Sequence, residues 1–288
     1  INMDEGFSID FFSLVVMNIT ETLDGSAILV SGNLHGTLSK GDSLYVVKPD
    51  NKFFKAEVTA MEAFSAEGKT EVTDSATNCT VRLSLKLEDE NAKLNQLDVL
   101  TNIEPMEKVD VNKKVENPLA AGLLFELARL GKNQAYNSVL TYALTHSSFI
   151  TPLRLEKAPE DNGDGTATFK KDTIIGFYML KSGRKDANEE TGENAFLLPV
   201  FTDWRAIGDW KGLNEKNEKI NTMIVTFPDA VTITQSPNFA GFVVNPFSEN
   251  QAIIDKKLLE VITNMEGYKR DFPGVRPAVP MSFHKEEE

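Results

Sequence analysis

Three glycines near the start of the chain constrain the fold of its first third. Gly32, Gly36 and Gly41 lie four and five residues apart, and short apolar strands surround them. Because only glycine enters positive φ without steric cost, this spacing is typical of the tight corners of a small antiparallel barrel. The run begins at Gly25, and the apolar residues 44–47 follow it. The pattern predicts an N-terminal antiparallel β-barrel.

Alternating apolar and polar residues predict the other strands of this barrel. Residues 78–87 alternate with a period of two, which is typical of a strand with one buried face. Cys79 is in phase with the apolar residues of this segment, so we expect its side chain in the core and not in a nucleophilic site. Further strands are predicted at residues 11–19, 27–30, 44–47 and 53–61.

A change of pattern in the second third predicts a second domain. Residues 104–116 are charged and poor in apolar side chains, which indicates a linker. We therefore expect two independently folding domains, the barrel at residues 1–106 and an α+β domain at residues 115–288.

Helix signals open and close this second domain. Asn117 and Pro118 mark a helix start, Gly131 marks its end, and a second helix begins at Asn133. A capping box at Ser248 predicts the last helix. Strands are expected at residues 149–155, 166–170, 173–180, 195–201, 219–227 and 242–244, with a short helix at 203–210.

The barrel resembles domain II of elongation-factor-like translation proteins, which follows their GTPase domain. Besides the glycines, residues 12–19 match its entering strand and residues 97–100 its closing strand. The resemblance implies the barrel fold. It implies no GTPase, because the chain has neither the Asn-Lys-x-Asp guanine signature nor an Asp-x-x-Gly switch in the matching context.

The second domain is similar to the SseB family, which is named for enhanced serine sensitivity. Residues 198–204 and 241–247 carry the resemblance, and the helices from Asn117 and Ser248 follow in the family's order. The similarity covers most of residues 117–263. It implies a compact α+β domain and no catalytic residue that could be carried over.

Charge and cysteine content limit the partners and the compartment. With 43 acidic and 30 basic residues the net charge is −13, which repels phosphate backbones and anionic membranes. We expect no nucleic-acid or membrane partner. A single cysteine excludes an internal disulfide and favours a reducing compartment, so the cytoplasm is expected. No apolar run is long enough to span a bilayer.

Two short motifs resemble ligand loops without their required context. Residues 68–70 read Gly-Lys-Thr, but barrel strands flank them instead of a strand and a helix. Residues 160–165 are acidic and glycine-rich, but Lys171 stands where a calcium loop needs glutamate.

The three histidines, His35, His146 and His284, are far apart in the sequence and do not form a metal-ligand pattern. No metal or cofactor is expected, and His146 is interpreted as a cation at a helix end.

Five residues after two strands are the candidates for a binding site: Thr202, Asp203, Trp204, Trp210 and Asn245. The two tryptophans are expected on one side of the short helix. Two interpretations stay open for these rings. They either pack in the core or form an exposed contact patch, because aromatic residues are enriched at interfaces as well. Asn245 either closes a turn that positions Ser248 or contributes to a site at the strand ends.

The sequence supports three hypotheses of function. The first is a non-enzymatic bacterial cytoplasmic protein that binds another protein or a small ligand through its α+β domain. The second is a translation-associated factor that contacts the ribosome through its barrel, against which the acidic charge weighs. The third is a hydrolase or transferase whose site unites Asp203, Asn245 and His146.

Overall fold

The chain forms two compact units. The computed structural model describes residues 11–21, 28–65, 67–89, 91–106, 113–155, 160–161, 167–168, 175–182, 196–214 and 220–274. Unit 1 comprises Ile1–Asp110 and Lys114–Leu144, and unit 2 comprises Val111–Lys113 and Thr145–Glu288. Gly25, Lys171, His284 and the predicted strand at 166–170, apart from its residues 167–168, lie outside the described residues.

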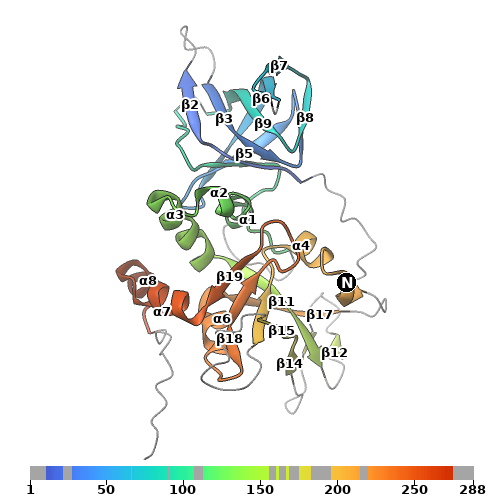
Figure 1. Ribbon diagram of the computed structural model, residues 1–288, viewed down its shortest axis with the longest axis vertical. Helices are drawn as coiled ribbons and strands as arrows, with labels where there is room; N and C mark the ends of the chain where they lie inside the picture. Colours follow the sequence, from blue (N-terminus) through green and yellow to red (C-terminus); the bar gives the residue numbers. More distant parts are fainter. Residues whose placement is uncertain are drawn as a thin grey trace, which may run out of the picture. The chain divides into compact units, whose positions relative to one another are not determined.

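Unit 1 contains a closed antiparallel barrel, which confirms the predicted fold (Figure 1). The strands follow the order β1-β10-β5-β6-β9-β3, and β1 pairs with β3 to close the ring. Their bounds are β1 Ser13–Val15, β3 Ile28–His35, β5 Ser43–Val47, β6 Phe53–Phe64, β9 Thr80–Leu87 and β10 Val99–Thr101. Shorter strands extend the barrel at its margins. β2 Asn18–Glu21 pairs with β3, β7 Thr70–Val72 pairs with β6, and β4 Thr37–Ser39 pairs with β8 Ser75–Thr77.

The inward-facing side chains of these strands form the core of the barrel. Cys79 packs against this core and is partly buried, in the position that its phase predicted. Burial follows the alternation in β9, where every second residue is buried. The buried core includes Leu14, Val30, Leu34, Val46, Val58, Leu83 and Leu100.

The three glycines of the barrel serve two different purposes. Gly36 and Gly41 both have a φ of +89°, the conformation expected of corners. A Cβ atom at Gly36 would also collide with the carbonyl oxygen of Phe11, whereas Gly41 has open space around it. Gly32 lies inside β3 and has no positive φ, so its expected place at a corner is wrong. It allows the backbone of Val15 to approach instead.

A helical segment belongs to the same compact unit as the barrel. It comprises α1 Pro118–Phe125, α2 Leu127–Leu130 and α3 Gln134–Thr145. A Cβ atom at Gly122 would collide with the side chains of Ser13 in β1 and Val99 in β10, so this glycine lets α1 lie close to both strands. The sequence assigned these helices to the second domain, but the unit boundary falls after Leu144. Independent folding of residues 1–106 and 115–288 stays a prediction.

Unit 2 is built around a four-stranded sheet in the order β15-β16-β18-β19. Its strands are β15 Leu180–Lys181, β16 Phe196–Val200, β18 Phe239–Val244 and β19 Ala252–Asp255. β16 and β18 are parallel, and the other pairs are antiparallel. A bridge between Ile150 and Phe201 connects this sheet to a second one, β14-β11-β17. The second sheet contains β14 Ile175–Phe177, β11 Ser148–Leu155 and β17 Asn221–Thr226; β12 Glu160–Asp161 pairs with β13 Ala167–Thr168.

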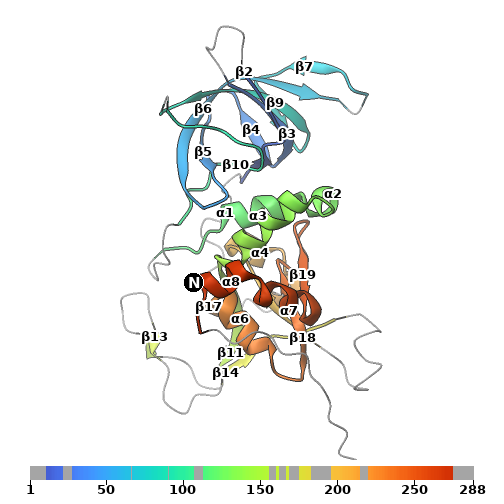
Figure 2. The same ribbon diagram turned by 90° about the vertical axis from the view of Figure 1, so that its left-hand side faces the viewer.

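Among its described residues unit 2 has five helices, of which α6, α7 and α8 gather on one side of its sheets (Figure 2). Their bounds are α4 Trp204–Gly208, α5 Lys211–Asn214, α6 Phe227–Thr234, α7 Lys256–Asn264 and α8 Glu266–Asp271. The mixture of helices and sheets confirms the predicted α+β class. No helix among the described residues has the length and apolar character that crossing a membrane requires.

In unit 2 the start of one helix and the end of one strand differ from the expected bounds. The helix expected from Ser248 begins only at Lys256, with Asp255 as its N-cap, because residues 252–255 pair with β18 as strand β19. The strand expected at residues 219–227 ends at Thr226. Thr226 and Asp229 form a capping box that opens α6, a helix that the sequence analysis missed.

Candidate functional site

The ends of the parallel strands β16 and β18 bring three of the candidate residues together. The side-chain oxygen of Asn245 accepts a hydrogen bond from the backbone N–H of Thr202 at 2.9 Å. Its amide nitrogen donates to the Thr202 hydroxyl at 3.0 Å, and that hydroxyl donates to Oδ2 of Asp203 at 2.9 Å. All three residues are buried. Asn245 therefore links the two strand ends.

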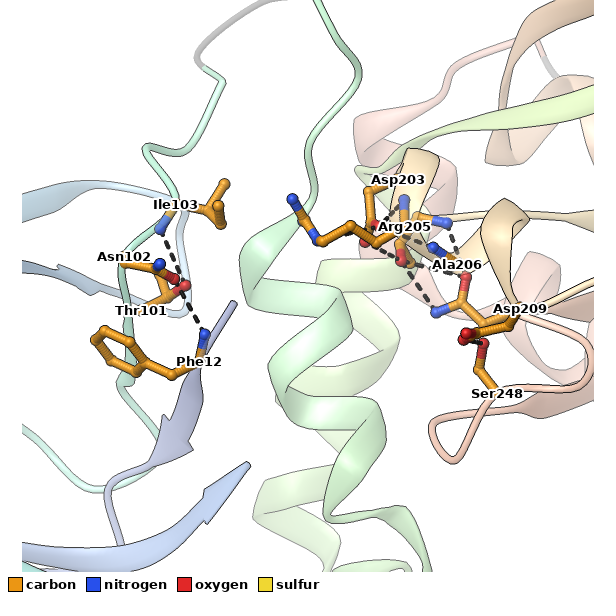
Figure 3. Close-up of polar contacts among 11 residues, drawn as sticks. Phe12, Thr101, Asn102, Ile103, Asp203, Arg205, Ala206, Asp209 and Ser248 are labelled. Atoms are coloured by element: carbon orange, nitrogen blue, oxygen red, sulfur yellow. Dashed lines mark hydrogen bonds and ion pairs between the residues drawn. The ribbon is translucent and has the colours of Figure 1, made fainter. Parts of the chain in front are cut away.

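Asp203 uses its other carboxylate oxygen to begin α4. Its Oδ1 accepts from the backbone N–H groups of Arg205 and Ala206 at 2.9 and 3.1 Å (Figure 3). This is the N-cap arrangement that stabilises a helix start. Both carboxylate oxygens are thus engaged in holding the strand end and the helix start, which is a structural task.

The two tryptophans do not share a helix. Trp204 is the first residue of α4 and is half-buried, whereas Trp210 lies between α4 and α5 because α4 ends at Gly208. Trp210 stacks on buried Phe201, with ring centroids 6.2 Å apart. The expectation that both rings line one side of the helix is wrong, and Trp210 instead joins a larger aromatic cluster.

Three rings form what we call the aromatic patch: Tyr178, Trp210 and Phe247. The ring centroid of Trp210 lies 5.8 Å from that of Tyr178 and 5.6 Å from that of Phe247. The guanidinium of Arg154 lies 4.9 Å above the ring of Tyr178, a cation–π arrangement. Phe247 has 57% of its surface exposed. The patch joins residues from three separate parts of unit 2.

The turn that presents Phe247 has an uncommon backbone. Asn245 has a φ of 48° and Phe247 a φ of 71°. Asparagine tolerates this region, but phenylalanine rarely enters it. Hydrogen bonds hold the turn: the N–H of Phe247 donates to Oε1 of Gln251 at 3.0 Å, and the Ser248 hydroxyl donates to Asp209 (Figure 3). The chain therefore fixes an exposed aromatic ring in a strained conformation.

Sequence reasoning missed Phe247, Tyr178 and Arg154 as parts of this surface. Phe247 directly follows Asn245-Pro246, which signals a turn but not which side chain the turn exposes. Tyr178 follows β14, and Arg154 lies on β11. Their proximity depends on the pairing of Arg154 with Gly176, which no local pattern specifies.

The other candidate motifs lie elsewhere. Nε2 of His146 lies 3.6 Å from a carboxylate oxygen of Asp271, and its ring packs against Phe272; both partners lie at the end of α8. Gly68 and Lys69 belong to the turn between β6 and β7, Gly68 has a φ of 77°, and Thr70 begins β7, so no helix follows. Among the residues that the structure describes, no three His, Cys, Asp or Glu side chains form a group that could hold a metal ion.

Unit 1 contains a polar network of its own around Glu126. This buried carboxylate lies 3.1 Å from Nε2 of His35 and accepts from Nε of Arg129 at 2.6 Å. Burial alone would raise the pKa of Glu126, but the hydrogen bonds with His35 and Arg129 outweigh it and lower that pKa. The network joins the end of β3 to the helical segment.

Three solved structures illustrate what this chain is similar to. They are GDP-bound aIF5B from Aeropyrum pernix (16% identity, TM-score 0.26), the apo elongation factor SelB from Methanococcus maripaludis (10%, 0.28), and the GTP-bound GTPase-like domain of S. cerevisiae Ski7 (8%, 0.27). The alignments cover 34%, 76% and 58% of this chain and 17%, 38% and 37% of those chains. Likeness at this level carries no argument about function. Curated proteins give no significant match.

The family comparison covers the region that contains the turn at residues 245–247. Residues 122–260 match the model of the SseB protein N-terminal domain. This range begins in α1 and ends in α7, and it includes the linked strand ends at Thr202 and Asn245. Both segments that carry the resemblance in the sequence, 198–204 and 241–247, fall inside it. Residues 122–260 of this chain are therefore similar to the SseB protein N-terminal domain.

Proposed function

We propose that this chain is a non-enzymatic bacterial cytoplasmic protein that binds another protein through the aromatic patch. One observation carries the proposal: Phe247 is held exposed in a left-handed backbone conformation beside Trp210. Strain of this kind costs about 1–3 kcal/mol and persists where surrounding structure enforces it, commonly at binding sites.

The energetics favour a partner that covers Phe247. Burying a phenylalanine side chain contributes about 1.5–3 kcal/mol, a gain that the exposed ring largely forgoes. A partner that covers the ring recovers this free energy without first ordering the turn, because its hydrogen bonds already fix it. The turn is therefore preorganised for binding.

The composition of the patch favours a protein partner. Tryptophan, tyrosine and arginine are the residues that carry most binding energy at protein interfaces. Trp210 and Tyr178 meet here beside Arg154, which is exposed, and the polar residues Asp209 and Ser248 lie at the margin. An aromatic centre with a polar rim is the usual anatomy of such an interface.

The strand-end cluster supports a non-enzymatic role. A general base needs a free acceptor directed at a substrate proton. Asp203 instead directs one carboxylate oxygen at Thr202 and the other at the backbone of α4. Its carboxylate is a helix cap, and His146 lies beside α8.

The test compares three baits in a bacterial extract: the native chain, Phe247→Ala, and the control Val72→Ala. Val72 is 77% exposed on β7 of unit 1, so the control removes an exposed apolar side chain outside the patch. We expect a discrete set of proteins on the native and control baits that Phe247→Ala loses. Equal retention by all three would contradict the proposal.

The rival hypothesis is that the barrel binds the ribosome. Co-sedimentation of ribosomes with the native chain and with Phe247→Ala distinguishes it from the proposed function. Ribosomes that co-sediment equally with the native chain and with Phe247→Ala would favour the barrel as the binding surface. The net charge of −13 leads us to expect no such co-sedimentation at physiological salt.

A further inference from the structure

The aromatic patch has polar groups that form no hydrogen bond within the part of the chain that the structure describes. These are Nε1 of Trp210 and the hydroxyl of Tyr178. Gly212 leaves Nε1 uncovered, because a Cβ atom at this residue would lie only 3.6 Å from it. The exposed guanidinium of Arg154 contacts the ring of Tyr178 and forms no ion pair with a described residue. Three polar groups beside the rings are therefore available to a ligand.

All three of these polar groups can donate hydrogen bonds. An indole N–H and a guanidinium only donate, and a tyrosine hydroxyl can donate or accept. An ordinary extended segment would bring carbonyl acceptors to them, but also one N–H for each residue, and burying those N–H groups on aromatic rings costs free energy. Proline brings the carbonyl without the N–H. The donors therefore favour a ligand that is rich in proline.

The spacing of the three rings matches one turn of a polyproline II helix. The centroid of Trp210 lies 5.8 Å from that of Tyr178 and 5.6 Å from that of Phe247, so the two outer centroids are at most about 11 Å apart. A polyproline II helix rises about 3.1 Å per residue with three residues per turn, which gives about 9 Å per turn. One turn of such a segment can therefore contact all three rings.

We propose that the segment of the partner that covers the aromatic patch is proline-rich and binds as a polyproline II helix. Its pyrrolidine rings pack on the three aromatic rings, and its carbonyl oxygens accept from Trp210, Tyr178 and Arg154. Such a segment is already extended before it binds, so little conformational entropy is lost. The inference rests on the proposed function and names the chemistry of its partner.

Calorimetric titration of the full chain with a decapeptide of L-proline tests the inference. We expect saturable binding that Phe247→Ala weakens at least about tenfold and that the control Val72→Ala, at an exposed site in unit 1, leaves unchanged. A decapeptide of D-proline has the same composition and the opposite helical hand, and it should bind at least about tenfold more weakly. No binding of the L-proline peptide, or equal binding of the two peptides, would overturn the inference.

Tyr178→Phe tests the donors without removing a ring. It deletes one hydroxyl and should weaken binding of the L-proline peptide about threefold to tenfold, the effect of one lost hydrogen bond. Tyr142→Phe deletes the hydroxyl of a tyrosine in unit 1 that is 37% exposed, and should leave binding unchanged. Equal binding by the two variants would overturn the role of the Tyr178 hydroxyl as a donor to the ligand.

The peptide titration and the extract experiment fail separately. If Phe247→Ala loses the captured proteins but the native chain does not bind the L-proline peptide, the proposed function stands and this inference alone is overturned. If all three baits retain the same proteins, the proposed function is contradicted, and the inference that rests on it falls as well. Release of the captured proteins from the native bait by the L-proline peptide, and not by the D-proline peptide, would support both.

Discussion

The corners of the barrel and the turn at residues 245–247 solve the same backbone problem differently. Gly36 and Gly41 supply positive φ with no side chain, because the barrel needs only the bend. In unit 2 the same region of φ is occupied by Asn245 and Phe247, which carry side chains at a cost in strain. Asn245 uses its amide to link two strands, and Phe247 presents its ring.

The largest effect is expected from Gly36→Val. The substitution forces a β-branched residue into positive φ and drives its Cβ into the carbonyl oxygen of Phe11, so we expect a loss of about 3 kcal/mol or more. Gly41→Val has the same φ but open space, and should lose only about 1–2 kcal/mol. Chemical denaturation measures both. Equal losses would show that the close approach of Phe11 does not matter.

A smaller loss is expected from Asn245→Ala. It leaves the buried N–H and hydroxyl of Thr202 without their amide partner and keeps the strained φ, so we expect about 2–3 kcal/mol. Asn245→Gly removes the same hydrogen bonds but relieves the strain and should lose about 1 kcal/mol less. The free energies of unfolding of the two variants check this order. If Asn245→Gly is the less stable, the strain argument is wrong.

Acid should weaken unit 1 through Glu126. Its pKa is lowered in the folded chain, so its contribution is complete above the ordinary value of 4.5 and is lost as the pH falls through the lower folded pKa. Glu126→Gln should cost about 1 kcal/mol at pH 7 and flatten the loss of stability below pH 4.5. Unfolding free energies between neutral and acidic pH give the slope. If the unfolding free energy of Glu126→Gln fell with pH as steeply as that of the native chain, Glu126 would not be the group responsible for the loss of stability in acid.

The barrel was predictable because its strands alternate and its corners need glycine. β9 follows the period of two that the sequence shows, and Cys79 lies where its phase places it. The domain boundary was harder to predict. Residues 118–124 of α1 are all buried, so the helix has no polar face to indicate which neighbour it packs against. Composition alone could not assign it to the unit of the barrel.

The sequence placed three of the candidate residues at strand ends, but it did not predict their mutual contacts; their role in binding stays a prediction. Thr202, Asp203 and Asn245 do converge, because the ends of parallel strands meet at one edge. Their mutual hydrogen bonds, however, depend on the rare φ of Asn245, which is a property of the folded turn. The exposure of Phe247 was hidden for the same reason, since phenylalanine after a proline is ordinarily interpreted as a core residue.

The smallest effect on stability, and the most direct test, is expected from Phe247→Ala. We predict an unfolding free energy within about 0.5 kcal/mol of the native value, because the ring is 57% exposed and alanine keeps the same backbone strain, so that mainly the contact with Trp210 is lost. Retention of the captured proteins should fall at least about tenfold in the same preparation. A loss of about 2 kcal/mol with unchanged retention would show that Phe247 only covers Trp210, and would contradict the account.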